Sequence, residues 1–206
     1  AEENVIPGFN LIVIDIDGNI PLAAAHELLA EYKFMTYTTK RHTEEENRFR
    51  LILPMNYVLE LDADEYKEFM NNVISWLPFS GVDESANQRS RKWSTFNGKF
   101  HLNTEGVHVN VLPFIPKTTR NAEFKQEFKA VASHDNLERW FAQRIASGSR
   151  NNQMLKYALA LVDSGLDMLE VNKRVHSFNK SINNPLPEAE LDATIMLTVS
   201  KRYQRN

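Results

Sequence analysis

LIVIDIDGNI, residues 11 to 20, is an apolar run that ends in two aspartates, a glycine and a polar residue. The β-branched residues of Leu11–Asp17 predict a strand that is buried on both faces. Asp15 and Asp17 are two positions apart, so their side chains leave the predicted strand on the same side. Crowded carboxylates repel each other, and a divalent cation neutralises them. The alternative is that one or both aspartates cap a following helix.

Composition limits the class of protein. Of the 206 residues, 42% are hydrophobic and 25% are charged, which predicts a soluble globular protein with a proper core. No apolar stretch approaches the roughly 20 residues that cross a bilayer, and no signal peptide opens the sequence. The absence of cysteine excludes disulfides and thiolate zinc sites and fits a cytoplasmic location. Because the net charge is −3, nucleic-acid binding would need a local basic patch.

The order of expected elements is typical of an α+β protein. The sequence predicts a helix over 22–32, strands over 34–39 and 48–53, a helix over 62–76, and short strands around 91–96 and 107–112. Asp62 or Asp64 is placed to cap the helix over 62–76. Elements in this order build a mixed sheet with helices packed on it.

The character of the sequence changes after Pro116. Helical patterns cover 123–131 and 136–145, and Ser147–Gly148–Ser149 marks a seam. Three more helical segments follow the seam, and the third begins at Pro187. The chain therefore divides into an α+β core over 1–117, a helical connector over 118–147 and a three-helix unit over 148–206.

Basic residues gather around the predicted hairpin. Lys40, Arg41 and His42 follow its first strand, and Arg48 and Arg50 lie two apart on the return strand. Such a cationic wall suits a triphosphate, because arginine donates in a fork and a histidine ring N–H can bond a phosphate oxygen. The alternative is a solvated hairpin whose charge is neutralised by the three glutamates between the strands.

A third carboxylate stands in GVDESANQRSRKW, residues 81–93. Asp83 precedes a short basic segment that contains Arg91. A single loop aspartate is usually a turn residue. It becomes a candidate third metal ligand if its loop returns to Asp15 and Asp17.

Taken in order, these segments resemble archaeo-eukaryotic-type primases, and more narrowly the primase-polymerase domains of phage and plasmid replication proteins. The matching segments are VIDID (13–17), TTKRHT (38–43) with RFRLILP (48–54), and VDESANQRSRKW (82–93). SRNNQMLKYALALVDSG (149–165) and NNPLPEAEL (183–191) resemble the primase C-terminal helical domain that follows such cores. The resemblance covers most of the chain and implies an RRM-like catalytic core followed by that helical domain.

The resemblance also implies an activity: template-directed nucleotidyl transfer on single-stranded DNA, for primer synthesis and DNA polymerisation. Two Mg²⁺ or Mn²⁺ ions would activate a primer 3′-hydroxyl and steady the leaving pyrophosphate. The implied metal ligands are Asp15, Asp17 and Asp83. The implied nucleotide-binding residues are His42, Arg48, Arg50, Arg91, Lys40 and Arg41. The implied partners are a single-stranded DNA template, nucleoside triphosphates and a helicase.

Two other functions stay open on the residues alone. A haloacid-dehalogenase-like phosphatase would use Asp15 as its nucleophile, but the DxDGT-type signature has threonine where this chain has Asn19. A non-catalytic replication module would bind single-stranded DNA in a basic groove with stacking aromatic residues. Trp93, Phe96 and Tyr37 are candidates for that stacking, although such residues more often belong to a core. The presence of all three carboxylates favours the catalytic interpretation.

Overall fold

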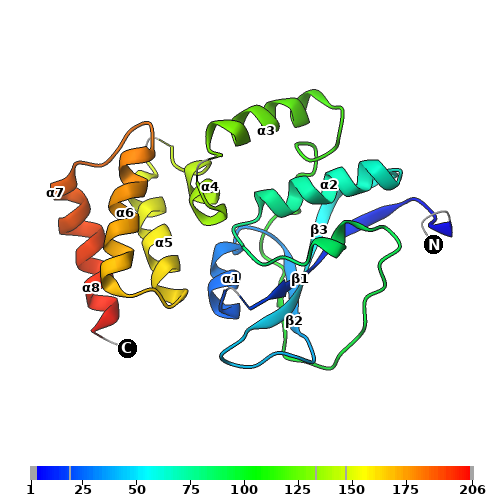
Figure 1. The fold of residues 1–206 in the computed structure, drawn as a ribbon, viewed down its shortest axis with the longest axis horizontal. Coiled ribbons are helices and arrows are strands. Elements are labelled where there is room, and N and C mark those ends of the chain that lie inside the picture. The colour runs from blue at the N-terminus through cyan, green and yellow to red at the C-terminus, as the bar shows by residue number, and fades with distance from the viewer. Residues whose placement is uncertain (1–3, 19, 133, 147, 205–206) are drawn as a thin grey trace. The chain divides into compact units, whose positions relative to one another are not determined.

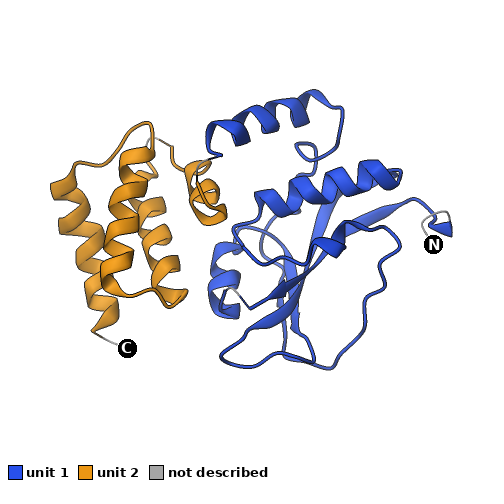
Figure 2. Cartoon of the chain, viewed as in Figure 1, with its two compact units in different colours: residues 1–132 blue, residues 133–206 orange. Residues whose placement is uncertain are grey.

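The computed structural model describes residues 4–18, 20–132, 134–146 and 148–204. The chain forms two compact units, residues 1–132 and 133–206, which Figure 2 distinguishes by colour. Their boundary falls within the range 118–147 expected as a connector, because α3 (Thr119–Ala130) belongs to the first unit and α4 (Asn136–Ala142) to the second. Ser147, part of the expected seam, lies outside the described residues.

The first unit is built on an antiparallel sheet in the order β1–β3–β2–β4 (Figure 1). The strands are β1 (Phe9–Asp17), β2 (Phe34–Thr38), β3 (Arg48–Leu59) and β4 (Phe100–Asn103). The accompanying helices are α1 (Leu22–Leu28), α2 (Ala63–Trp76) and α3, with a 3₁₀ turn, η2 (Glu84–Asn87). The α+β class is confirmed. Among the described residues, the parallel pairing expected of a mixed sheet is limited to isolated bridges, Tyr32 with Val107 and Met55 with Val109.

One face of the sheet forms the core of this unit. Ile12, Ile14 and Ile16 alternate along β1 and are fully buried. α1 and α2 supply much of the cover, and Ala25 and Phe69 on these helices are also fully buried. The prediction that β1 is buried on both faces is wrong, because its other face carries Leu11, which is 46% exposed, together with the two aspartates.

α2 begins at the residue that the sequence suggested. Asp62 Oδ1 accepts a hydrogen bond from the Glu65 backbone N at 2.8 Å, and the Asp62 backbone N donates to Glu65 Oε2 at 3.4 Å. This reciprocal pair is a capping box, which satisfies two backbone donors at the helix start. Asp62 is therefore the cap, and Asp64 lies in the first turn.

The two strands expected around 91–96 and 107–112 are not formed as predicted. Residues 91–99 have no regular secondary structure, and the chain joins the sheet only at β4. The reason is that the segment bonds to side chains: the Ser94 carbonyl accepts from Arg50 Nη1 at 2.8 Å, and the Lys99 backbone N donates to Thr38 Oγ1 at 2.8 Å. Around 107–112 the pairing is limited to the two isolated bridges.

The second unit is helical. Its core is formed by α4, α5 (Arg150–Asp163), α6 (Met168–Ser181) and a third segment made of α7 (Glu188–Glu190), η3 (Leu191–Met196) and α8 (Leu197–Tyr203). The three predicted helical segments after the seam are thus present, and η3 is a π-helical turn within the third. Tyr157 and Phe178 pack at 4.6 Å between ring centroids in this core. No described helix of either unit has the length and apolar character needed to traverse a bilayer.

His26 on α1, which contacts the sheet, makes the stability of the first unit depend on pH. His26 Nε2 lies 2.8 Å from Thr36 Oγ1, and its ring stacks on that of His101 at 4.1 Å. Burial, followed by the effect of His101, lowers the pKa of His26 from 6.5 to about 4. The unfolded chain therefore takes up this proton first as the pH falls.

We expect the free energy of unfolding to fall as the pH is lowered from about 6.5 towards about 4, the interval between the two pKa values. Urea denaturation at about pH 7 and about pH 5 measures the change. In His26→Gln, whose amide can still bond Thr36, this contribution should be absent. The same loss of stability in both proteins would contradict the assignment.

Candidate active site

The pairing of β1 with β3 places two aspartates of the site opposite two arginines. Asp15 lies directly opposite Arg50, and Asp17 lies opposite Arg48, so each aspartate faces an arginine across the strands. Arg50 binds Asp15 with a fork: Nε donates to Oδ1 at 2.7 Å and Nη2 donates to Oδ2 at 3.2 Å. The contact of Arg48 Nη1 with Asp17 Oδ1 is longer, at 3.4 Å. The prediction that the two arginines share one face of the return strand is confirmed.

The loop after α2 brings the third carboxylate to the same place. Residues 81–83 run along β1, with a bridge between Val82 and Ile16, and the Asp83 backbone N donates to the Asp15 carbonyl at 3.1 Å. Arg91 Nη2 then joins the two side chains, at 2.7 Å from Asp83 Oδ2 and 3.4 Å from Asp15 Oδ2. The structure thus brings together Asp83, Asp15 and Arg91, which are far apart in the sequence.

Asp83 also has the turn role that its sequence context suggested. Its Oδ1 accepts from the Ser85 backbone N at 2.9 Å and from Ser85 Oγ at 2.6 Å, and it caps the turn η2. These hydrogen bonds from Ser85, with a smaller contribution from Arg91, lower the pKa of Asp83. The carboxylate is therefore charged and fixed in orientation, with Oδ1 used by the turn and Oδ2 directed to Arg91.

Side chains from two other segments hold the guanidinium groups. The Trp93 ring lies 4.7 Å from Arg50 Cζ and 4.7 Å from Arg91 Cζ, within the range of cation–π contacts. Tyr37, opposite Arg50 on β2, accepts from Arg50 Nη1 at 2.5 Å. Burial alone would lower the pKa of Arg50, but hydrogen bonding and charge from Asp15 outweigh it and raise the pKa.

Trp93 and Tyr37, which the sequence suggests as base-stacking residues, both contact Arg50 in the structure. Phe96 is 46% exposed, so the alternative that it belongs to the core is wrong. Ser85 and Ser94 were missed as site residues. The Asp-x-Ser spacing of residues 83–85 is a turn signal that could have identified Ser85, whereas nothing local marks the Ser94 carbonyl as a partner of Arg50.

Among the basic hairpin residues, His42 and Arg48 bond to each other, whereas Lys40 and Arg41 are exposed. His42 Nδ1 accepts from the Arg48 backbone N at 3.1 Å, so the neutral ring carries its proton on Nε2. Arg48 Nη2 also contacts Glu46 Oε1 at 2.6 Å, so part of the expected neutralisation by glutamates occurs. Lys40 and Arg41 are exposed in the turn after β2, and among the described residues no ion pair links them to the three aspartates.

Two donors in the site have no partner within the described protein. Arg48 Nε and Arg91 Nε are buried without a hydrogen bond to any described residue. A buried guanidinium donor left unsatisfied is costly and is rarely tolerated without a functional reason.

The donor types suit a divalent cation of the magnesium class, because three carboxylates offer hard oxygen ligands. In this structure the carboxylates are instead bound by arginines, and no group of three or more acidic or histidine side chains is arranged around a metal position in the described part of the chain. Asp17 is the most available of the three, since its side chain is 49% exposed and makes one long contact to Arg48. The chemistry of the set fits a metal site, with the arginines as competing partners.

Comparison with known families covers both units. Residues 2–98 match the family model of the VapE N-terminal domain. This range of the chain contains β1, β2, β3 and all of the site described above. Residues 124–196 match the family model of Primase C terminal 1 (PriCT-1), from within α3 to the end of η3. No curated protein and no solved structure matches the chain. The chain therefore joins a segment similar to the VapE N-terminal domain to a segment similar to a primase C-terminal domain, and the two matches support a primase-like replication protein.

Proposed function

We propose that the first unit catalyses template-directed nucleotidyl transfer on single-stranded DNA, extending a primer with nucleoside triphosphates. The observation that carries this proposal is a cluster of three carboxylates paired with three arginines. Two of these arginines, Arg48 and Arg91, have a buried donor without a partner among the described residues. Phosphoryl transfer needs mainly positioning and stabilisation of charge, which these groups can supply. The match of this unit to a replication family supports the same class of substrate.

Asp15, Asp17 and Asp83 would hold Mg²⁺ or Mn²⁺. When bound, such ions lower the pKa of a primer 3′-hydroxyl and neutralise charge on the phosphates. In the reaction, the 3′-oxygen forms a bond to the α-phosphorus of the nucleotide, the bond to the pyrophosphate oxygen breaks, and the hydroxyl proton passes to solvent or to a nearby base.

The arginines and His42 would bind the triphosphate. Arg48 Nε and Arg91 Nε, which are buried here, would donate to phosphate oxygens once these side chains change partners, and His42 Nε2 carries the proton that lets the ring donate as well. Arg50 differs from the other two arginines, since its donors are used by Asp15, Tyr37 and the Ser94 carbonyl. Its role is to position Asp15, whereas Lys40 and Arg41 would contact the phosphates only if the hairpin turn bends toward the site.

This assignment implies an exchange of partners. Arg91 holds both Asp15 and Asp83 without ligand, so it would transfer to the phosphates as the carboxylates take the metal. The exchange conserves charge pairing, because each anion keeps a cation and each cation keeps an anion.

The test is nucleotide incorporation on a primed single-stranded DNA template with Mg²⁺ or Mn²⁺, comparing the unaltered chain with Asp83→Asn. Asp83 is chosen because a phosphatase that uses Asp15 as nucleophile has no role for it. We expect template-dependent product that is lost in the variant. Product that persists undiminished in Asp83→Asn would contradict the assignment of the third ligand.

The phosphatase alternative has less support. Both family matches are to replication and primase domains, not to phosphatases. The non-catalytic DNA-binding module makes a different prediction: DNA binding that survives removal of metals, without any nucleotide incorporation. A helicase partner and a cytoplasmic location stay predictions.

A further inference from the structure

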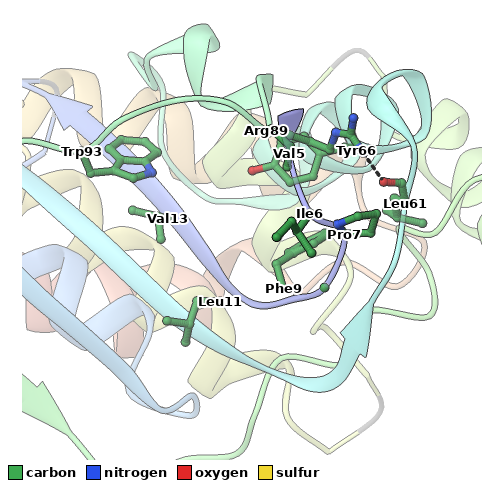
Figure 3. Close-up of a pocket in the computed structure, with 11 residues that line it drawn as sticks. Val5, Ile6, Pro7, Phe9, Leu11, Val13, Leu61, Tyr66, Arg89 and Trp93 are labelled. Carbon is green, nitrogen blue, oxygen red and sulfur yellow. Dashed lines mark hydrogen bonds between the residues drawn. The ribbon is translucent and has the colours of Figure 1, made fainter. Parts of the chain in front are cut away.

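A pocket of about 170 Å³ lies beside the site, on the open face of β1 (Figure 3). Leu11 and Val13 line it from the strand, and the N-terminal segment around Ile6 and Phe9 lines another side. Trp93, which lies near Val13 in Figure 3, lines it as well. An apolar cavity of about 150 Å³ is large enough to hold a benzene ring. The pocket therefore has room for a planar ring system but not for a whole nucleotide.

The walls have the character of an aromatic ring site. Trp93 and Tyr66 provide aromatic surfaces, Leu11 and Val13 provide an apolar floor, and Arg89 is a polar group on the wall. Arg89 Nη1 donates to the Leu61 carbonyl at 2.9 Å, which holds the guanidinium group in place at the pocket. An aromatic face with apolar support and a hydrogen-bonding residue can stack a base and contact its edge.

The pocket lies close enough to Asp15 for one nucleotide to reach both. Val13 precedes Asp15 by two residues on the same face of β1, which is a separation of about 7 Å along the strand. Trp93 borders the pocket and also contacts Arg50 and Arg91, the arginines bound to Asp15. A ring in the pocket therefore lies within one nucleotide of phosphates bound at the arginines.

We propose that this pocket receives a nucleobase, stacked on Trp93, while the attached phosphates lie at the arginine–carboxylate cluster. The inference rests on the proposed function for the position of the phosphates, but base binding can be measured without catalysis. The base belongs either to the nucleoside triphosphate or to the single-stranded DNA, and the two sources are separated by the experiment.

The experiment measures the affinity of the full chain for four probes in the presence of Mg²⁺. They are dTTP, tripolyphosphate, an oligo-dT of about 12 nucleotides and an abasic oligodeoxynucleotide of equal length. The probes form two pairs, dTTP with tripolyphosphate and oligo-dT with the abasic oligodeoxynucleotide. For each pair, the readout is the affinity for the base-containing probe divided by the affinity for the base-free probe. Because the ratio cancels effects on phosphate binding, it reports the base with its deoxyribose in the first pair and the base alone in the second.

Leu11→Trp fills the pocket from its exposed side. We expect it to lower the ratio about 10-fold for the pair whose base occupies the pocket, as the loss of one base stack predicts. A fall for dTTP alone identifies the incoming nucleotide, and a fall for oligo-dT alone identifies the single strand. Leu102→Trp is the matched control, because Leu102 is 54% exposed on the same face of the sheet at β4, outside the pocket lining, and should change neither ratio.

A second pair of variants keeps the test decisive if Leu11→Trp fails to fold. Trp93→Ala should lower the same ratio, and Trp93→Phe should retain most of it, because an aromatic face remains. Unchanged ratios for both pairs in folded Leu11→Trp, or in Trp93→Ala, would overturn the proposal, as would the failure of every probe to bind. A lowered ratio without any nucleotide incorporation would instead retain the base pocket and refute the proposed catalysis.

Discussion

Arg50→Met is expected to lower the free energy of unfolding by about 3 kcal/mol, the cost typical of breaking a buried ion pair by removing one partner. The side chain of Arg50 is 7% exposed and that of Asp15 is 15% exposed, so solvent cannot replace the fork between them. The variant also leaves Tyr37 and the Ser94 carbonyl without their donor. Chemical denaturation of the full chain measures the change.

Two comparisons identify the cause. Arg48→Met makes the same substitution one pair further along the strands, but Asp17 is 49% exposed and the contact is long, so the loss of stability should be much smaller. Adding Asp15→Asn to Arg50→Met should recover part of the stability, because it removes the uncompensated carboxylate. Equal losses for Arg48→Met and Arg50→Met would show that burial of the pair does not determine its contribution.

Asp17→Asn is expected to reduce nucleotide incorporation at least about 100-fold while leaving the thermal stability of the chain nearly unchanged. The expected size follows from metal sites in which even outer-shell changes cost about 10–100-fold. Asp17 gives a cleaner test than Asp15, because Asp15 also anchors Arg50, whereas the half-exposed Asp17 makes one long contact with Arg48. Single-turnover incorporation at saturating template, with a melting curve of the same preparation, measures both effects.

Asp64→Asn serves as the control for removing one negative charge, since Asp64 is exposed in the first turn of α2 and outside the site. It should retain full activity. If Asp17→Asn loses activity only in proportion to a loss of folded protein, Asp17 is a structural residue and not a ligand. If it keeps full activity while folded, the proposed ligand set is wrong at this position.

Most elements followed from patterns that act within a few residues. The strand over 11–17, the cap at Asp62 and the three apolar helical segments after residue 148 depend on local sequence, and the structure confirms these elements. The strands expected near 91–96 and 107–112 failed for the opposite reason. In this segment the Ser94 carbonyl bonds to Arg50 and the Lys99 backbone N bonds to Thr38, distant residues that no local pattern includes.

The sequence by itself determined the α+β class and the helical second part, and it supplied the candidate site residues, because strand and helix patterns, capping and residue chemistry are local properties. The pairing of Asp15 with Arg50, the return of Asp83 to Asp15 and the pocket beside Trp93 were decided only by the tertiary structure. Strand register fixes which charges face each other, and the 81–93 loop fixes which residues return to β1. Both depend on contacts between segments distant in sequence, so the ion pairs that occupy the carboxylates emerged only in the folded chain.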